Sequence, residues 1–326
     1  MDMKKYILMF FCATLIWSCN NDDNSTLEPS YTDVDWFEIK DGPDEIDHLR
    51  YEIYKSTGIS VLYSDVLGTQ FRGFDGFGDS IIHVQKLDPY YAITGRSGNI
   101  SYTFSGNKTD IRNGVLFLKE EVIPLLNPVI YPRSFLLVES LILNASSTVA
   151  AGNREGNVFK GMMTTFVGYV SRMENLNTAE KHALAAEISA PIWTVYLEME
   201  FTEELVPFYL VSNNSVTNWP TSATNKNTYN RDVRSNPGNY DIPTKPHWNE
   251  FGFLIRNPDI ISNTNIPTLL YYTPTQTQDL TSFIQAALTY NEAEFQALYE
   301  NVTGYNLLIT KYRMIKGLID EVNNKY

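Results

Sequence analysis

The chain contains four histidines, the side chains that most often bind metals and exchange protons near neutral pH. Two imidazoles share one zinc ion readily when they stand one turn apart on a helix. His182 and Glu187 are five residues apart, which places them on different faces of a helix. The spacing predicts no histidine zinc motif, and we expect His182 to be partly exposed near a helix start. No two of the histidines lie three to five residues apart: they are His48, His83, His182 and His247.

A glycine-rich segment, residues 73–79, carries two carboxylates that could contribute to a cation site. Asp75 and Asp79, with neighbouring carbonyl oxygens, offer the hard ligands that calcium prefers. A tight surface turn explains the same glycines and is the favoured interpretation. The chain has no G-x-S-x-G, P-loop lysine or G-x-G-x-x-G motif. The paired carboxylates of a glycoside hydrolase lie far apart in sequence, so that class stays open.

The N-terminal residues predict an exported protein. Two lysines precede an apolar run, residues 6–17, that is shorter than the ~20 residues of a membrane-spanning helix. Residues 15–19 (LIWSC) resemble the bacterial lipobox, with a tryptophan where a small residue is usual. The resemblance implies a lipoprotein signal peptide of residues 1–18 and acylation of Cys19 by palmitate-type chains. A secretory signal with an incidental cysteine is the alternative.

Residues 19–40 are interpreted as a lipidated, flexible tether. Several acyl chains on Cys19 give stable membrane anchoring, whereas a single chain is marginal. The polar and acidic run after this cysteine resembles the surface-export signal of lipoproteins in the Bacteroidetes phylum. We therefore expect the protein on the outer membrane, held by lipid and facing the cell exterior. Since Cys12 is removed and Cys19 is acylated, no disulfide is expected.

The chain that remains after cleavage is acidic. Residues 19–326 carry 37 acidic and 23 basic side chains, a net charge of −14. This balance repels nucleic-acid phosphates, and no basic stripe with interleaved aromatic residues is present. Nucleic acid is therefore excluded as a partner. No further apolar run approaches the ~18 residues that suggest a membrane span.

The periodicity of apolar residues predicts an α+β fold in a single domain, residues 41–326, because helices alternate with strands first and only helices follow. Asn177 and Glu180 form a capping-box pattern at the start of the central helix. Residues 212–246, rich in Asn, Ser, Thr and Pro, are expected to be an irregular surface segment. The predicted helices are residues 44–56, 114–127, 177–198 and two or three within 275–323; the predicted strands are 59–63, 134–138 and parts of 157–169.

This order of elements resembles the zinc-binding metallopeptidase-like lipoproteins that are encoded beside outer-membrane nutrient importers in Bacteroidetes. The resemblance covers nearly the whole mature chain and implies a zincin-like fold. Such a fold has a small mixed sheet, a central active-site helix and a helical C-terminal part. The segments that carry the resemblance are residues 58–63, 123–126 before 135–138, 252–253, and the helices after 278–280.

The resemblance also locates a former metal site. In that family the central helix carries H-E-x-x-H, two zinc ligands and a catalytic glutamate. Here Ala186 and Ala190 occupy both histidine positions, and only Glu187 remains. Ser282 occupies the position of the third ligand, a downstream carboxylate. The resemblance therefore implies a pseudoenzyme with no metal or other cofactor. Pro191 is expected to bend or end the helix, which also argues against a working site.

The function implied is that of a non-catalytic, surface-exposed accessory subunit of a TonB-dependent nutrient import complex. It would bind a peptide or glycan, or the transporter and its lid lipoprotein. One alternative is an active zinc-dependent peptidase or other hydrolase with a displaced site, and another is a structural subunit of an outer-membrane assembly machine. Aromatic residues in polar segments are the expected ligand or partner contacts: Tyr90, Tyr91, Trp219 and Trp248.

Overall fold

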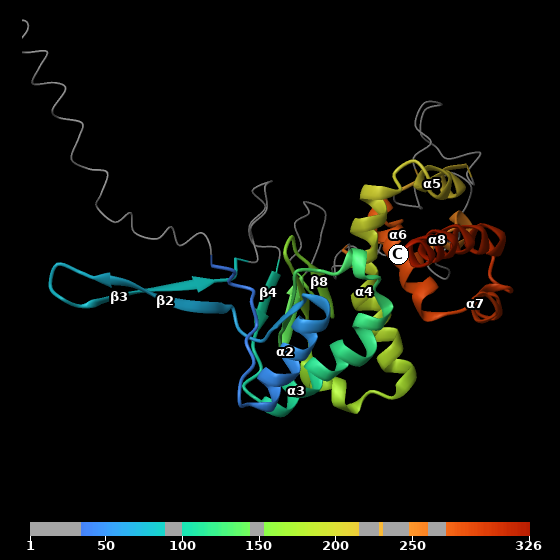
Figure 1. Cartoon of the computed structure of the whole chain (residues 1–326). Coiled ribbons are helices and arrows are strands. Elements are labelled where there is room, and N and C mark those ends of the chain that lie inside the picture. The colour runs from blue at the N-terminus through green and yellow to red at the C-terminus, as the bar shows by residue number, and fades with distance from the viewer. Residues whose placement is uncertain (1–33, 89–99, 144–152, 215–227, 231–247, 260–271) are drawn as a thin grey trace, which may run out of the picture. The chain divides into compact units, whose positions relative to one another are not determined.

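The computed structural model describes residues 34–88, 100–143, 153–214, 228–230, 248–259 and 272–326 (Figure 1). Residues 37–326 form one compact unit, and of the preceding unit, residues 1–36, only the last three residues are described. Several predicted features lie outside the described residues: the signal peptide, Cys19, Tyr90, Tyr91, Trp219 and His247.

A four-stranded mixed sheet lies in the interior of residues 37–326. Its strand order is β1-β5-β9-β8, in which β8 is antiparallel to β9 and the other neighbours are parallel. Every residue of β1, β5 and β9 is buried, as short apolar runs with β-branched residues predict. The three strand predictions are therefore confirmed. The strands are β1 (Ser60–Leu62), β5 (Ser134–Leu137), β8 (Val158–Lys160) and β9 (Thr164–Val167).

Two smaller antiparallel sheets were not predicted. One has the strand order β4-β6-β7, and the other is a two-stranded ribbon of β2 and β3 (Figure 1). The glycine-rich segment forms the turn of this ribbon, where the Asp75 carboxylate accepts the backbone N–H groups of Phe77 and Asp79 at 2.8 and 2.9 Å. These strands are β2 (Val66–Phe74), β3 (Ser80–Lys86), β4 (Ile100–Thr103), β6 (Ser140–Leu143) and β7 (Arg154–Glu155).

The first predicted helix is confirmed and the second begins earlier than predicted. Helix α2 spans Glu45–Thr57 and ends at Gly58, whose left-handed backbone (φ 75°) closes the last turn. Helix α3 spans Lys108–Phe117, so the predicted start at residue 114 is wrong. The Asn107 side chain accepts the Thr109 N–H and caps the helix at this earlier position. Single π and 3-10 turns continue it to residue 125.

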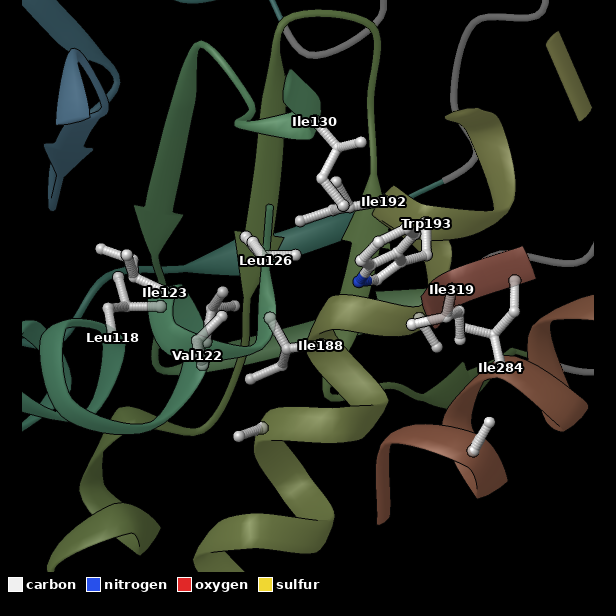
Figure 2. Close-up of a cluster of buried hydrophobic side chains, with 14 of the residues drawn as sticks. Leu118, Val122, Ile123, Leu126, Ile130, Ile188, Ile192, Trp193, Ile284 and Ile319 are labelled. Carbon is white, nitrogen blue, oxygen red and sulfur yellow. The ribbon is translucent and has the colours of Figure 1, made fainter. Parts of the chain in front are cut away.

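The central helix, α4, spans Thr178–Glu200 and opens with the predicted capping box. The predicted helix of residues 177–198 is confirmed, and it continues through Pro191, which was expected to bend or end it. Proline removes one helical hydrogen bond, but residues on several sides of α4 are buried, so packing holds both halves of the helix. Trp193 is fully buried, and its indole N–H donates to the Leu125 carbonyl at 3.0 Å (Figure 2).

The C-terminal part contains three helices, as predicted. Helix α6 packs against α4 and α8, and α7 packs against α8. A further helix, α5, was not predicted and includes Ser212, which was assigned to an irregular segment. Ile188 and Ile192 of α4 share one core with Ile284 of α6 and Ile319 of α8 (Figure 2). The helices are α5 (Leu205–Asn214), α6 (Gln276–Thr289), α7 (Glu292–Tyr299) and α8 (Tyr305–Lys325). The fold is therefore α+β.

Candidate functional site

A cleft runs along one side of α4, beside Glu187. It consists of two adjoining hollows of about 290 and 320 Å³ that share Asn157, Glu187 and Gln285 in their walls. Glu187 comes from α4, Gln285 from α6, and Asn157 from the residue before β8. We call this feature the Glu187 cleft. Packing of α4 against α6 and β8 places these three side chains together.

Glu187 is half-buried in the wall of this cleft. The Asn157 side-chain amide donates to its carboxylate at 3.0 Å. Burial raises the pKa of Glu187 above its ordinary value, while the Asn157 hydrogen bond and the Arg154 charge oppose the shift. A carboxyl in this environment keeps its proton to higher pH than an exposed one. When protonated it can both donate and accept a hydrogen bond.

Helix α6 forms the opposite wall with amide and hydroxyl groups. Thr281 Oγ lies 2.8 Å from Thr194 Oγ, which links α6 to α4. The Gln278 amide donates to Asp259 at 2.7 Å, and Arg154 donates to the same carboxylate at 3.2 Å. Because Arg154 pairs with Asp259, the positive charge of Arg154 is partly neutralised. The cleft therefore offers neutral hydrogen-bonding groups and little net charge.

A buried ion pair fixes the position of α6. Asp279 and Lys311 of α8 are both fully buried and form a salt bridge. The Lys311 ammonium also donates to Ser212 Oγ and to the Gly252 carbonyl, each at 3.0 Å, so its three protons are all used. Tyr229 donates to Asp279 at 2.9 Å. The pair therefore connects α5, α6 and α8 at one point beside the residues of the cleft wall.

Desolvation acts on both members of this pair. Burial raises the pKa of Asp279 and lowers the pKa of Lys311 to about 8, and each partner's charge opposes the shift of the other. The aromatic rings of Phe208 and Phe283 lie 4.4 and 4.7 Å from the ammonium nitrogen and stabilise its charge. Three backbone and side-chain acceptors plus these rings replace the water that the lysine lost.

The structure brings together some of the positions that the resemblance assigns to a metal site and separates others. Glu187 and Ser282 line the same hollow. Ala186 and Ala190 are fully buried and are not among the residues of its wall. The Ser282 hydroxyl donates to the Asp279 carbonyl of its own helix at 2.7 Å. The positions that the resemblance assigns to metal ligands thus lie partly inside the packed core.

The residues of the cleft do not fit a zinc ion. Zinc in proteins takes three or four ligands from histidine, cysteine and carboxylate side chains. Among the described residues, the walls of the two hollows contribute only two carboxylates, Glu180 and Glu187. The described part of the chain contains no group of three His, Cys, Asp or Glu side chains placed to hold a metal.

The described histidines lie on separate elements. His48 on α2 lies 2.9 Å from Asp41, whose carboxylate raises the pKa of the imidazole. His83 lies on β3, beside Gln85. His182 lies near the start of α4 and is half-buried, as predicted. The three imidazoles therefore form no shared site.

Trp248, the one predicted aromatic contact among the described residues, is half-buried. It begins a 3-10 turn and packs against Phe251, Phe253 and Tyr229. It does not line the Glu187 cleft. Trp248 therefore takes no part in this cleft, and its expected contact with a ligand or partner stays a prediction.

The side chains that do line the cleft were missed, apart from Glu187 and Ser282. Asn157, Gln278 and Gln285 have no local motif, because long-range packing alone brings them to Glu187. One backbone signal marks the region: Tyr169 in the wall has a left-handed backbone (φ 60°), which costs energy for a residue with a side chain. The Arg172 guanidinium lies 3.8 Å from the centre of its ring.

Comparison with protein-family models, with curated proteins and with solved structures gave no significant match. Among the described residues, no helix combines the length and apolarity needed to cross a membrane.

Proposed function

We propose that this protein is a non-catalytic, lipid-anchored subunit on the cell surface that binds a neutral polar ligand in the Glu187 cleft. The ligand is a peptide or a glycan, and the protein serves a TonB-dependent nutrient import complex as an accessory subunit. The main support for the binding role is that Glu187, Asn157 and Gln285 all line one cleft.

The absence of catalysis is inferred from residue chemistry at the motif positions. Metal-dependent hydrolysis needs ligands that hold the ion and a base that acts on the bound water. Ala186 and Ala190 have no donor atom and are fully buried. The Ser282 hydroxyl is already bonded within α6. Glu187 has the side chain of a base but no metal-bound water on which to act, so a binding role explains its position better.

The preference for a neutral ligand follows from the groups in the wall. A carboxyl with a raised pKa and the neighbouring amides can both donate and accept hydrogen bonds. Peptide amides and sugar hydroxyls have the same dual capacity. The walls contain two cations, Arg154 and Arg172, and each pairs with a carboxylate, that of Asp259 or Glu155, so neither is reserved for an anionic ligand. Val158, Ile255 and Pro258 add apolar surface for the less polar faces of a peptide or sugar.

The location and the partner complex rest on the N-terminal residues and on the family resemblance. Acylation of Cys19 would hold the protein at the membrane, and the acidic run after it resembles a surface-export signal. An importer is the partner because the lipoproteins that the chain resembles are encoded beside importers. Fold alone does not determine this partner.

A binding screen with matched variants tests the proposal. The full-length protein, purified in detergent, is applied to peptide and glycan arrays together with Asn157→Ala and Glu200→Gln. Asn157→Ala removes the hydrogen bond to Glu187, whereas Glu200 is an exposed acid on the same helix and serves as the control. We expect a ligand that binds the unsubstituted chain and Glu200→Gln, with at least ~10-fold weaker binding to Asn157→Ala, a loss of ~1.4 kcal/mol.

Affinity purification of the tagged protein from its own membranes tests the partner. Co-purification of a TonB-dependent transporter supports the accessory role. Recovery of outer-membrane assembly subunits instead would favour the structural alternative. Zinc in stoichiometric amount together with hydrolysis of an array ligand would contradict the non-catalytic role.

A further inference from the structure

The ribbon of β2 and β3 exposes an apolar face. Phe71 lies opposite Ile82, and Thr69 lies opposite Val84. Residues two apart in a strand point to the same side, so these four side chains share one face. The alternate positions of the two strands, on the other face, carry Gln70, Arg72, His83 and Gln85, together with one exposed apolar side chain, Ile81.

A bulge adds a further aromatic ring to the apolar face. Gly73 has a left-handed backbone (φ 107°), and the pairing shifts between Phe71 and Phe74. Because of this extra residue, Phe74 lies opposite Ser80 and so on the same face as Ile82. The Phe71 and Phe74 rings are in edge contact, with centroids 5.1 Å apart. Without the bulge, Phe74 would point to the polar face.

This apolar face is open to solvent in the structure. The exposed fractions are 50% for Phe71, 67% for Phe74 and 95% for Phe77 at the tip, and Ile82 and Val84 are also exposed. A ribbon that only connected two elements would be expected to expose polar side chains to water and not an apolar face. Contiguous exposed apolar patches of this kind mark interaction surfaces.

We propose that this apolar face, made of Phe71, Phe74, Phe77, Ile82 and Val84, packs against the same face of a second copy of the chain. The resulting dimer has two-fold symmetry, so the same residues contribute from both copies. This inference goes beyond the binding function of the Glu187 cleft and does not depend on it.

The exposed area is sufficient for such a dimer. Together the three phenylalanines expose the equivalent of about two whole rings, and one aromatic side chain buries roughly 150–250 Å². The rings alone therefore offer about 300–500 Å² on each copy. With Ile82 and Val84 added, two facing ribbons bury about 1,000 Å², the least that a specific interface needs.

Charge favours a second copy over a lipid bilayer. Residues 66–86 carry two acids and two bases and are therefore neutral, although the whole chain has a net charge of −13. Two neutral ribbons can meet without repulsion. Insertion of the tip into lipid would carry Asp75 and Asp79 into the bilayer together with Phe77. Backbone hydrogen bonds hold the pKa of Asp75 below its ordinary value, so this carboxylate stays charged. Burial of a charged group in lipid is costly.

Crosslinking tests the orientation of the interface. Thr69→Cys adds a thiol to the apolar face, and Gln70→Cys adds one to the opposite face as the matched control. The chain has no cysteine other than Cys12 and Cys19, so the unsubstituted protein measures the background. With a short bis-maleimide reagent, we expect a covalent dimer of Thr69→Cys and only background for Gln70→Cys.

Sedimentation velocity of the full-length protein in detergent tests the energetics. We expect a reversible dimer whose dissociation constant rises by at least ~10-fold in Phe74→Asp. Phe77→Ser should weaken it less, because it removes a ring without placing a charge in the interface. Helical content measured by circular dichroism should stay unchanged, because Phe74 is largely exposed. A monomeric chain at all concentrations, or a dimer that Phe74→Asp leaves intact, overturns the proposal. Phe74-dependent binding to phosphatidylcholine vesicles without dimer formation also overturns it and assigns the face to lipid.

Discussion

Among single residues, two polar groups withdrawn from water stand out: the half-buried Glu187 and the fully buried Lys311. Glu187 is held by Asn157 in the cleft wall, and Lys311 is held by Asp279 behind it. Both cost desolvation energy, and both gain specific partners in return. They differ in role: Glu187 lies where a ligand can reach it, whereas Lys311 is fully enclosed and joins three helices.

Glu187→Gln should stabilise the protein at neutral pH and not in acid. The folded-state pKa of Glu187 is raised above that of the unfolded chain. The carboxyl therefore contributes stability that is fully present below its unfolded pKa and is lost as the pH rises through the folded value. Glutamine stays neutral and can still accept from Asn157. Urea unfolding at pH 4 and pH 7 measures the difference; an equal effect at both pH values would refute the raised pKa.

Lys311→Met should destabilise the fold by about 3–5 kcal/mol, because it leaves the Asp279 carboxylate buried without its counter-charge. The matched control is Lys316→Met on the same helix, which removes only an exposed pair with Asp320 and should cost less than ~1 kcal/mol. Chemical denaturation measures both. The double variant Lys311→Met with Asp279→Leu should recover much of the loss, and no recovery would mean that the pair contributes more than charge compensation.

Among the helices and strands, α4 is the element whose packing decides which side chains can reach the cleft. Its burial on several sides explains why the helix continues through Pro191. The same burial places Ala186 and Ala190 in packed surroundings, with no exposed surface. Small residues at these positions therefore have a structural reason, which is close packing of α4 against its neighbours.

Introducing histidines at positions 186 and 190 should fail to create a metal site. Each imidazole at position 186 or 190 overpacks the core, so Ala186→His with Ala190→His should lower stability by about 1–3 kcal/mol per site. Ala183→His on the same helix is the control, since Ala183 lines the cleft and is only partly buried. Thermal melts and zinc content measure the outcome. A stable variant that binds one zinc ion would show that the cleft can still accommodate the metal.

The elements that were predicted correctly have local signals. Asn177 and Glu180 cap α4, Asp44 and Gly58 bound α2, and apolar runs mark the buried strands. The ribbon of β2 and β3 was missed because its glycines lower strand propensity and its pairing needs the bulge at Gly73. The cleft was predicted only at Glu187 and Ser282. The amide residues of the cleft come from distant segments of the chain, and no sequence spacing predicts that they lie together.

At the scale of the whole molecule, an acidic chain carries a neutral, apolar ribbon and a cleft with little charge. The net charge of −13 keeps copies of the chain apart except where uncharged surface is available. The two surfaces are separate in sequence, because the ribbon lies before residue 87 and the cleft after residue 142. Ligand binding and self-association can therefore be tested by independent substitutions.

Salt should strengthen the dimer. Added salt screens the repulsion between two acidic chains, and the ribbon contact has no charge pair for salt to weaken. We expect the dissociation constant to fall between ~20 mM and ~500 mM sodium chloride, the range over which the Debye length shrinks several-fold. Sedimentation velocity at both concentrations is the measurement. Weaker association at high salt would indicate an interface made by charged residues instead.

If the Glu187 cleft binds its ligand without a metal, a chelator should leave binding unchanged. Isothermal titration of the purified protein with the ligand found on the arrays, in the presence and absence of EDTA, tests it directly. We expect the same affinity with and without the chelator, no turnover of the ligand, and at least ~10-fold weaker binding to Asn157→Ala. Binding or turnover that EDTA abolishes would contradict it.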